Sequence, residues 1–322
     1  MINKQGGMIM ISNHAKVLVI KKTNSILFKI LRFILLFGIS FIILYPLITK
    51  FMISFMSIED VYNNSVKYIP KNFTLDNYEN AIEILEINKI VLTSFLVPGV
   101  LSVIHMCSST LVAYGFARYN FRLKKFFFGL VLVGLVIPPD LVLLPLYMQF
   151  RYFDVFGIFE LLTGSSISLL NTPWPQVLLG STCTGLKNGL YIFIMIQYFR
   201  GLPKELEEAA YVDGASTFQA FIKVFLPSAK QIMMTVFLFS FVWQWLDDIY
   251  TSAFMKNVKI MSTQLLRLSN TDLGNAMGIQ NMAEFSLMRN ASMVIALLPV
   301  LILYLICQKY FTESVERSGL TG

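Results

Sequence analysis

The stretch "ELEEAAYVDGASTFQAFIKVFLP", residues 205–227, places Glu205, Glu207, Glu208 and Asp213 within nine positions. Long apolar segments, 177–199 and 232–250, lie on either side of it. Runs of about 20 apolar residues are typical of helices that span a membrane. The sequence therefore predicts an acidic, helix-prone loop between two membrane-spanning segments.

The loop itself has the pattern of two short helices. Good helix formers fill 204–211, and the acidic residues of its first turns complement the positive end of a helix dipole. Gly214 suits a left-handed cap that ends this helix, and Ser216 can cap the next. The apolar residues of the second helix recur at helical spacing: Phe218, Phe221, Ile222 and Phe225. Leu226 and Pro227 are expected to stop it.

The composition extends the membrane interpretation to the whole chain. Hydrophobic residues make up 56% of the 322 residues and charged residues only 14%, too few charges for the surface of a soluble domain. We predict an all-α integral membrane protein with six transmembrane helices. The expected spans are 33–55, 90–116, 126–150, 177–199, 232–250 and 291–311. Prolines inside four of them favour kinked helices that move, although irregular packing explains them equally well.

The basic residues predict the orientation. The net charge of +7 reflects Lys and Arg residues that collect on cytoplasmic loops, and the chain has no nucleic-acid-binding motif. The short turn "RYNFRLKK", residues 118–125, is the clearest such loop. We expect a cytoplasmic tail over 1–32, a membrane domain over 33–311 with a cytoplasmic loop at 201–230, and a cytoplasmic tail over 312–322.

The loop carries a specific resemblance to a known family. "EEAAYVDGASTFQAFIKVFLP" is similar to the EAA loop of binding-protein-dependent ABC importer permeases. That signature is Glu-Ala-Ala, three residues, Gly, nine residues, an aliphatic residue, one residue and Leu-Pro. It falls here on Glu208, Ala209, Ala210, Gly214, Val224, Leu226 and Pro227, with Val224 where the family commonly has Ile.

Further segments resemble one subfamily, the maltose-type carbohydrate permeases, and in particular the six-span subunit of the pair. These segments are "YIPKNFTLDNY" (68–78), "AYGFAR" (113–118), "IPPDLVLLPLY" (137–147), "GLYIFIMIQYFRGLPKELEEAA" (189–210) and "ERSGLTG" (316–322). The resemblance covers nearly the whole chain from the first span onward. It implies the type I ABC importer permease fold.

The resemblance also implies a function and a set of partners. The loop would be a coupling helix that docks on a dimer of separate ABC ATPase subunits. The residues expected to contact them are Glu205, Glu207, Glu208, Ala209, Ala210, Asp213 and Gly214. A second permease subunit would complete a heterodimer, and an extracytoplasmic solute-binding protein would deliver a sugar. The expected location is the bacterial plasma (inner) membrane, with both termini cytoplasmic.

The energy source is expected to lie in the partners. The chain has no GxxxxGK[ST] phosphate loop, so ATP and Mg²⁺ would be bound by the ATPase subunits and the chain itself would need no cofactor. No catalytic set of side chains and no metal-ligand spacing is visible, and Cys107, Cys183 and Cys307 stand far apart. We therefore expect a subunit that is not an enzyme.

Four ionisable residues fall at membrane depth: Asp140, Lys187, Asp247 and Asp248. Intramembrane charges usually face a cavity or one another, so we expect Lys187 to pair with one of the aspartates and to line a solute pathway. The alternative is that they merely reach the outer interface. The polar and aromatic candidates for this pathway are Tyr114, Tyr147, Asn188, Tyr191, Trp243 and Gln244, whereas His105 is expected to be a packed, hydrogen-bonded core residue.

Two other classes of function compete with the importer. A secondary transporter driven by H⁺ or Na⁺ would use the intramembrane aspartates, but no second, homologous half is visible. A membrane-embedded enzyme would need a catalytic constellation. Association with an ATPase would separate the importer from both.

Overall fold

The computed structural model describes residues 5–268 and 281–319, which fall into two units, one up to Leu75 and one from Asp76 onward. Most of the described residues are helical, and no strand occurs among them beyond the isolated bridges Met56–Phe73 and Phe153–Ile167. The all-α prediction is confirmed.

The first unit consists of a long helix and a small folded loop. Helix α1 runs over Gln5–Ile53, and its part Ile26–Ile53 is apolar and long enough to cross a membrane. After α2 (Ile58–Tyr62), the chain folds back so that Asp60 accepts hydrogen bonds from the backbone N–H groups of Lys71 and Asn72, each at 2.8 Å. This buried carboxylate fixes the loop.

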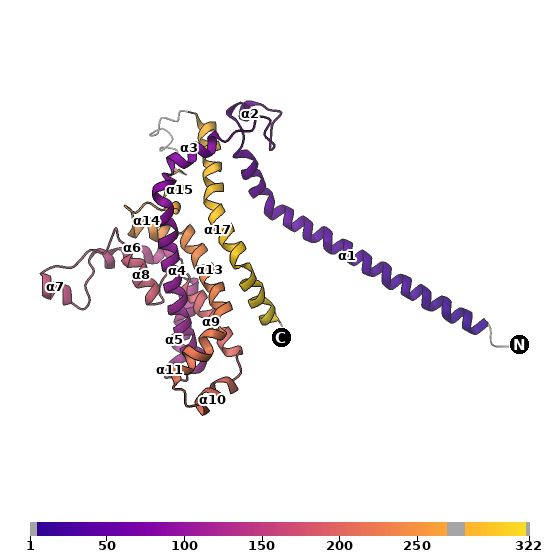
Figure 1. Cartoon of the computed structure of the whole chain (residues 1–322). Coiled ribbons are helices and arrows are strands. Elements are labelled where there is room, and N and C mark those ends of the chain that lie inside the picture. Colours follow the sequence, from indigo (N-terminus) through magenta and orange to yellow (C-terminus); the bar gives the residue numbers. More distant parts are fainter. Residues whose placement is uncertain (1–4, 269–280, 320–322) are drawn as a thin grey trace. The chain divides into compact units, whose positions relative to one another are not determined.

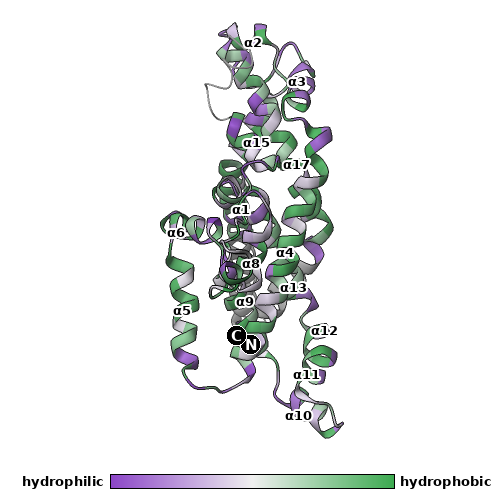
Figure 2. Cartoon of the chain, turned by 90° about the vertical axis from the view of Figure 1, so that its left-hand side faces the viewer, coloured by the Kyte–Doolittle hydropathy of each residue, from purple (hydrophilic) through white to green (hydrophobic). Residues whose placement is uncertain are grey.

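The second unit is built around long helices that pack side by side. Helix α4 (Ile87–Arg118) packs against both α9 (Asn188–Gly201) and α13 (Lys230–Leu246), and α13 packs against α17 (Met282–Gly319) (Figure 1). Hydrophilic residues of this unit gather near its ends, around α3 (Asp76–Ile84) and α10 (Glu205–Val212), as Figure 2 shows. This distribution fits a bundle whose middle lies in lipid.

Helix length and composition recover most of the predicted spans. In the described ranges, Ile26–Ile53, Ile87–Arg118 and Met282–Lys309 each suffice to cross a membrane. Two bent pairs raise the number to as many as five: α5 (Lys124–Val136) with α6 (Pro139–Arg151), bent by 105°, and Thr217–Ser228 with α13, bent by 73°. The first bend falls where Pro138 and Pro139 interrupt the third predicted span.

The fourth predicted span, 177–199, is wrong as a continuous helix. Helix α8 (Trp174–Ser181) ends before a turn over 182–187, and α9 begins only at Asn188. Cys183 and Lys187 in this turn both have a φ of 60°, a left-handed conformation that no helix interior permits. The turn reads "TCTGLK", but the apolar residues on both sides of it keep the average hydropathy of the segment high, so a hydropathy pattern does not reveal the break.

Further short helices complete this unit. They are α7 (Ile158–Thr163), α14 (Ile249–Phe254) and α15 (Met261–Leu268). The segment before α15 is tied to α4, because the Met261 N–H donates to Ser94 Oγ at 2.9 Å and Lys259 Nζ lies 2.6 Å from Glu86 Oε2. The start of α4 is thereby fixed to a segment that follows it by more than 150 residues.

Candidate functional site

The acidic loop folds as the predicted pair of helices. Helix α10 is followed by Gly214 at a φ of 79°, and Ser216 begins α11 (Thr217–Ala220) with a capping box to Gln219. Ser216 Oγ accepts from the Gln219 N–H at 3.3 Å, and Gln219 Oε1 accepts from the Ser216 N–H at 2.8 Å. A side chain at position 214 would strain this turn, which explains the glycine.

The end of the loop differs from the prediction. The chain does not stop at Leu226 and Pro227 but continues through a wide π turn, η1 (Phe221–Phe225), into α12 (Leu226–Ser228). Proline is tolerated there because it stands in the first turn of α12, where an N–H is not required. The sharp bend instead follows Ser228, before α13.

The two faces of α10 separate the predicted coupling residues. Glu205, Glu208, Ala209, Asp213 and Gly214 are exposed. Ala210 is 7% exposed and faces the protein, so of the two alanines expected to contact the ATPases, Ala209 alone is exposed.

Glu207 also turns inward. It accepts a hydrogen bond from Tyr211 Oη at 2.8 Å, and this bond to a carboxylate raises the pKa of the Tyr211 phenol. The sequence pattern did not single out Val212, yet it is 87% exposed on the outer side. The outer surface of α10 therefore combines carboxylates with an apolar residue.

Arg118 at the end of α4 holds the inner side of the loop. Its Nη2 donates to the Leu202 carbonyl at 2.8 Å, its Nη1 lies 3.9 Å from Glu207 Oε2, and its guanidinium stands 4.8 Å from the centre of the Phe225 ring. The sequence placed Arg118 in a basic turn, and nothing in its local pattern indicated these partners.

An aromatic cluster joins the loop to the bundle. The Tyr114 ring of α4 lies 4.6 Å from that of Phe221, 5.2 Å from that of Phe225 and 5.6 Å from that of Phe199. Of the predicted apolar face, Phe221 and Phe225 are buried, whereas Phe218 is 65% exposed. Tyr114 thus packs with the loop at the end of the bundle.

The predicted ion pair of Lys187 does not form in the described part of the chain. Lys187 Nζ lies instead 4.8 Å from the centre of the Trp243 ring, a cation–π contact between the turn before α9 and helix α13. The physical reason is the break in the fourth span, which moves Lys187 out of a helix and into the turn.

Asp247 has neutral partners. This buried carboxylate accepts from the Thr251 N–H at 2.9 Å, from Thr251 Oγ1 at 2.8 Å and from Gln176 Nε2 at 3.2 Å. Gln176 stands on α8 and was missed, because a single glutamine in an apolar run carries no distinctive signal. Asp247 therefore links α8 to the start of α14.

The remaining buried candidates lie around α4. Asn188 Nδ2 donates to Ser109 Oγ at 3.0 Å, and the Tyr191 ring lies 5.9 Å from that of His105. Gln244 is buried on α13. His105 is packed as predicted, although its Nδ1 has no hydrogen-bond partner in the part of the chain that the structure describes.

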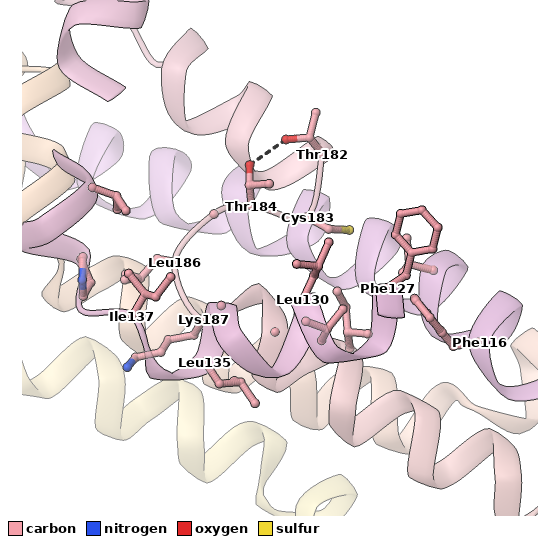
Figure 3. A pocket seen from close by; sticks show the side chains of 18 of the residues that line it. Phe116, Phe127, Leu130, Leu135, Ile137, Thr182, Cys183, Thr184, Leu186 and Lys187 are labelled. Atoms are coloured by element: carbon pink, nitrogen blue, oxygen red, sulfur yellow. Dashed lines mark hydrogen bonds between the residues drawn. The ribbon is translucent and has the colours of Figure 1, made fainter. Parts of the chain in front are cut away.

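Two cavities are lined by other residues that were predicted for the solute pathway. One of about 660 Å³ lies between α4, α5 and the turn before α9, with Phe116 and Phe127 at one end and Lys187 at the other (Figure 3). Another of about 350 Å³ is lined by Asp140 and Tyr147 of α6 together with Lys256. The predicted pathway residues are thus distributed over several places rather than gathered in one site.

A metal centre is not indicated by the described residues. Within them, no three His, Cys, Asp or Glu side chains are grouped so that they could hold an ion.

Comparison with known proteins identifies the family. Residues 109–317 match the binding-protein-dependent transport system inner membrane component family. A probable ABC transporter permease of Pyrococcus horikoshii is 28% identical over 288 residues, covering 88% of this chain and 92% of the relative. The arabinooligosaccharides transport system permease protein AraQ of Halalkalibacterium halodurans is 28% identical over 309 residues, covering 94% and 99%.

A solved structure shares the fold. The crystal structure of a bacterial ABC transporter involved in the import of the acidic polysaccharide alginate contains a chain that is 22% identical, with a TM-score of 0.65 over 88% of this chain and 96% of that one. The helical architecture is thus that of a type I ABC importer permease. Because the family match spans more than half of the sequence, the chain belongs to the inner membrane components of binding-protein-dependent transport systems.

Proposed function

We propose that the chain is the permease subunit of an ATP-driven importer for a sugar or oligosaccharide. Family membership supports the importer, and the names of relatives such as AraQ support the carbohydrate. The observation that carries the coupling role is the exposed outer face of α10. This face presents carboxylates beside Val212 and ends at the fixed Gly214 turn.

In this proposal, α10 docks on one subunit of an ABC ATPase dimer, which binds ATP and Mg²⁺. A second permease subunit provides the other half of the pathway, and an extracytoplasmic solute-binding protein delivers the sugar. Closure of the ATPases would move α10, and the packed joint at Arg118 and Tyr114 would carry that movement into the helices. The basic turn 118–125 and both chain ends would then face the cytoplasm.

The solute pathway is proposed to use the candidates that are exposed or that line a cavity. Trp243 is 43% exposed and holds Lys187 against its face, and Asp140 and Tyr147 line the smaller cavity. Aromatic faces and a few polar groups suit a sugar ring, which has both apolar faces and hydroxyl groups. Asn188, Tyr191, Gln244 and Asp247 are buried, so they would shape the pathway from behind.

The first prediction tests docking. We expect Glu208→Lys and Gly214→Val to insert in the membrane normally but to lose co-purification with the ATPase subunit, roughly tenfold or more. Lys reverses a charge on the outer face, and Val cannot adopt the φ of 79° without strain. The measurement is the amount of ATPase retained on the tagged chain.

The matched control is Glu83→Lys, an exposed glutamate on α3 that should leave ATPase association unchanged. Wild-type levels of ATPase with both loop variants would refute the coupling role. Transport by the isolated chain on an ion gradient alone would refute the importer.

A further inference from the structure

Arg118 has a charged side chain in a buried position, where a charge costs free energy because it has lost its water. Its side chain is 6% exposed at the C-terminal end of α4. A buried guanidinium persists only where polar partners compensate for the water it has lost. The partners of Arg118 therefore indicate which parts of the protein this buried charge holds together.

Among the residues that the structure describes, the partners of Arg118 belong to the loop region and none to α4. The Leu202 carbonyl follows the end of α9, Glu207 lies on α10 and Phe225 ends η1. The strongest contact is the 2.8 Å bond to the carbonyl, since the 3.9 Å ion pair is at the limit of such interactions. One planar side chain thus joins a transmembrane helix to successive segments of the loop.

The polypeptide chain does not connect α10 directly to α4. The chain enters it from α9 and leaves it through α11, η1 and α12 toward α13. Helix α4 is distant in sequence, yet it packs against α8, α9 and α13. A movement of α10 therefore reaches α4 through packing and side-chain contacts, and at the end of α4 Arg118 makes the polar contacts with the loop.

We propose that Arg118 is a positioning residue that transmits movement of α10 to helix α4. This inference rests on the proposed coupling function of α10. Arg118 lies behind the docking surface, because the exposed residues of α10 point away from it and Glu207 points toward it. Loss of the guanidinium should thus leave docking intact, but α4 should no longer follow the movement of α10.

The test uses the assembled complex of full-length chain and its ATPase, with MgATP and vanadate as the probe. Hydrogen exchange is followed in peptides of α10 (Glu205–Val212) and of α4 (Ile87–Arg118). In the wild type, we expect trapping to change exchange in both helices. In Arg118→Gln, the ATPase should remain bound and α10 should respond, but the response of α4 should fall about fivefold or more.

Two further variants test whether the reduced response of α4 is caused by loss of the guanidinium of Arg118. Arg118→Lys keeps the charge but not the planar group, so it should restore part of the α4 response. Arg122→Gln removes an exposed arginine of the neighbouring turn and should match the wild type in both helices. If Arg118→Gln does not fold, the Arg118→Lys protein still shows whether the α4 response is reduced.

The outcomes separate this inference from the function on which it rests. A wild-type chain that retains no ATPase, or whose α10 does not respond, would overturn the coupling function itself. A full α4 response in the Gln variant, or loss of the ATPase from both Arg118 variants, would overturn the positioning role alone. If both Arg118 variants lose the ATPase, the role of Arg118 would be to maintain the docking surface.

Discussion

Individual side chains in this protein take roles that their neighbours in sequence do not reveal. Glu207 and Glu208 are adjacent in a helix with three glutamates, yet one binds Arg118 and Tyr211 while the other is exposed. Lys187 lies against Trp243 rather than beside an aspartate. Each outcome depends on which distant helix faces the residue.

The pair Glu86–Lys259 gives a prediction of pH dependence at this scale. The hydrogen bond from Lys259 lowers the pKa of Glu86 below its ordinary value of 4.5. A lowered folded-state pKa stabilises the fold above the unfolded-state pKa, and this contribution is lost as the pH falls through the folded-state value. Both side chains are partly exposed, so the effect is small and sensitive to salt.

We therefore expect Glu86→Gln to lower the midpoint of thermal unfolding slightly at about pH 7 and to have no effect once Glu86 is protonated, near about pH 3. Thermal unfolding of the detergent-solubilised protein at both pH values measures this. Glu83→Gln, which removes another exposed carboxylate nearby in sequence, is the control. An equal difference at both pH values would show that the ion pair does not stabilise the fold.

At the scale of elements, the broken fourth span is the main departure from a simple bundle. The turn over 182–187 passes close to α4, where His105 occupies the space left by Gly180 and Gly185. Ser108 Oγ also donates to the Gly180 carbonyl at 2.7 Å. Backbone groups freed at membrane depth must be satisfied by neighbouring helices, and α4 provides such a partner.

This packing predicts the effect of a single methyl group. A Cβ at Gly180 would approach the His105 ring to 2.6 Å, so we expect Gly180→Ala to destabilise the protein by about 1–3 kcal/mol. Thermal unfolding in detergent is the measurement. Gly99→Ala is the matched control on α4, since nothing lies within 4 Å of its Cβ. A Gly180→Ala protein as stable as Gly99→Ala would mean that His105 moves freely.

At the scale of the whole molecule, exposed surfaces are the ones that require partners. The most apolar window of Ile26–Ile53 contains no buried residue, and Val212 is 87% exposed beside the carboxylates of α10. Lipid or another permease subunit would cover the first surface, and the proposed ATPase would cover the second. The ion-gradient transporter and the membrane enzyme gain no support from the family match.

The exposure of Val212 leads to a prediction about assembly. If it contributes an apolar contact to a docked ATPase, Val212→Asp should reduce co-purified ATPase by roughly tenfold while the thermal midpoint of the isolated chain stays unchanged. The reason is that Val212 contributes little to the fold but would be desolvated on docking. Val61→Asp is a control at an exposed valine of α2. Equal ATPase retention by the two variants would remove Val212 from the interface.

The membrane class, most of the spans and the two helices of the acidic loop with their Gly214 and Ser216 caps could be predicted from the amino-acid sequence alone. These features depend on local composition, helical spacing and turn chemistry, which a short window contains. The motif of the loop also carried the resemblance to the family that the comparisons established.

The sequence could not predict which glutamate of α10 faces inward, where the fourth span breaks or what Arg118 and Asp247 bind, and these features became visible in the folded chain. The folded chain also divides the predicted pathway residues among several sites. Those features depend on helices distant in the chain, such as α4 against α8, α9 and the loop. A buried polar group is specified by the partners that compensate for its lost water, and no local pattern names those partners.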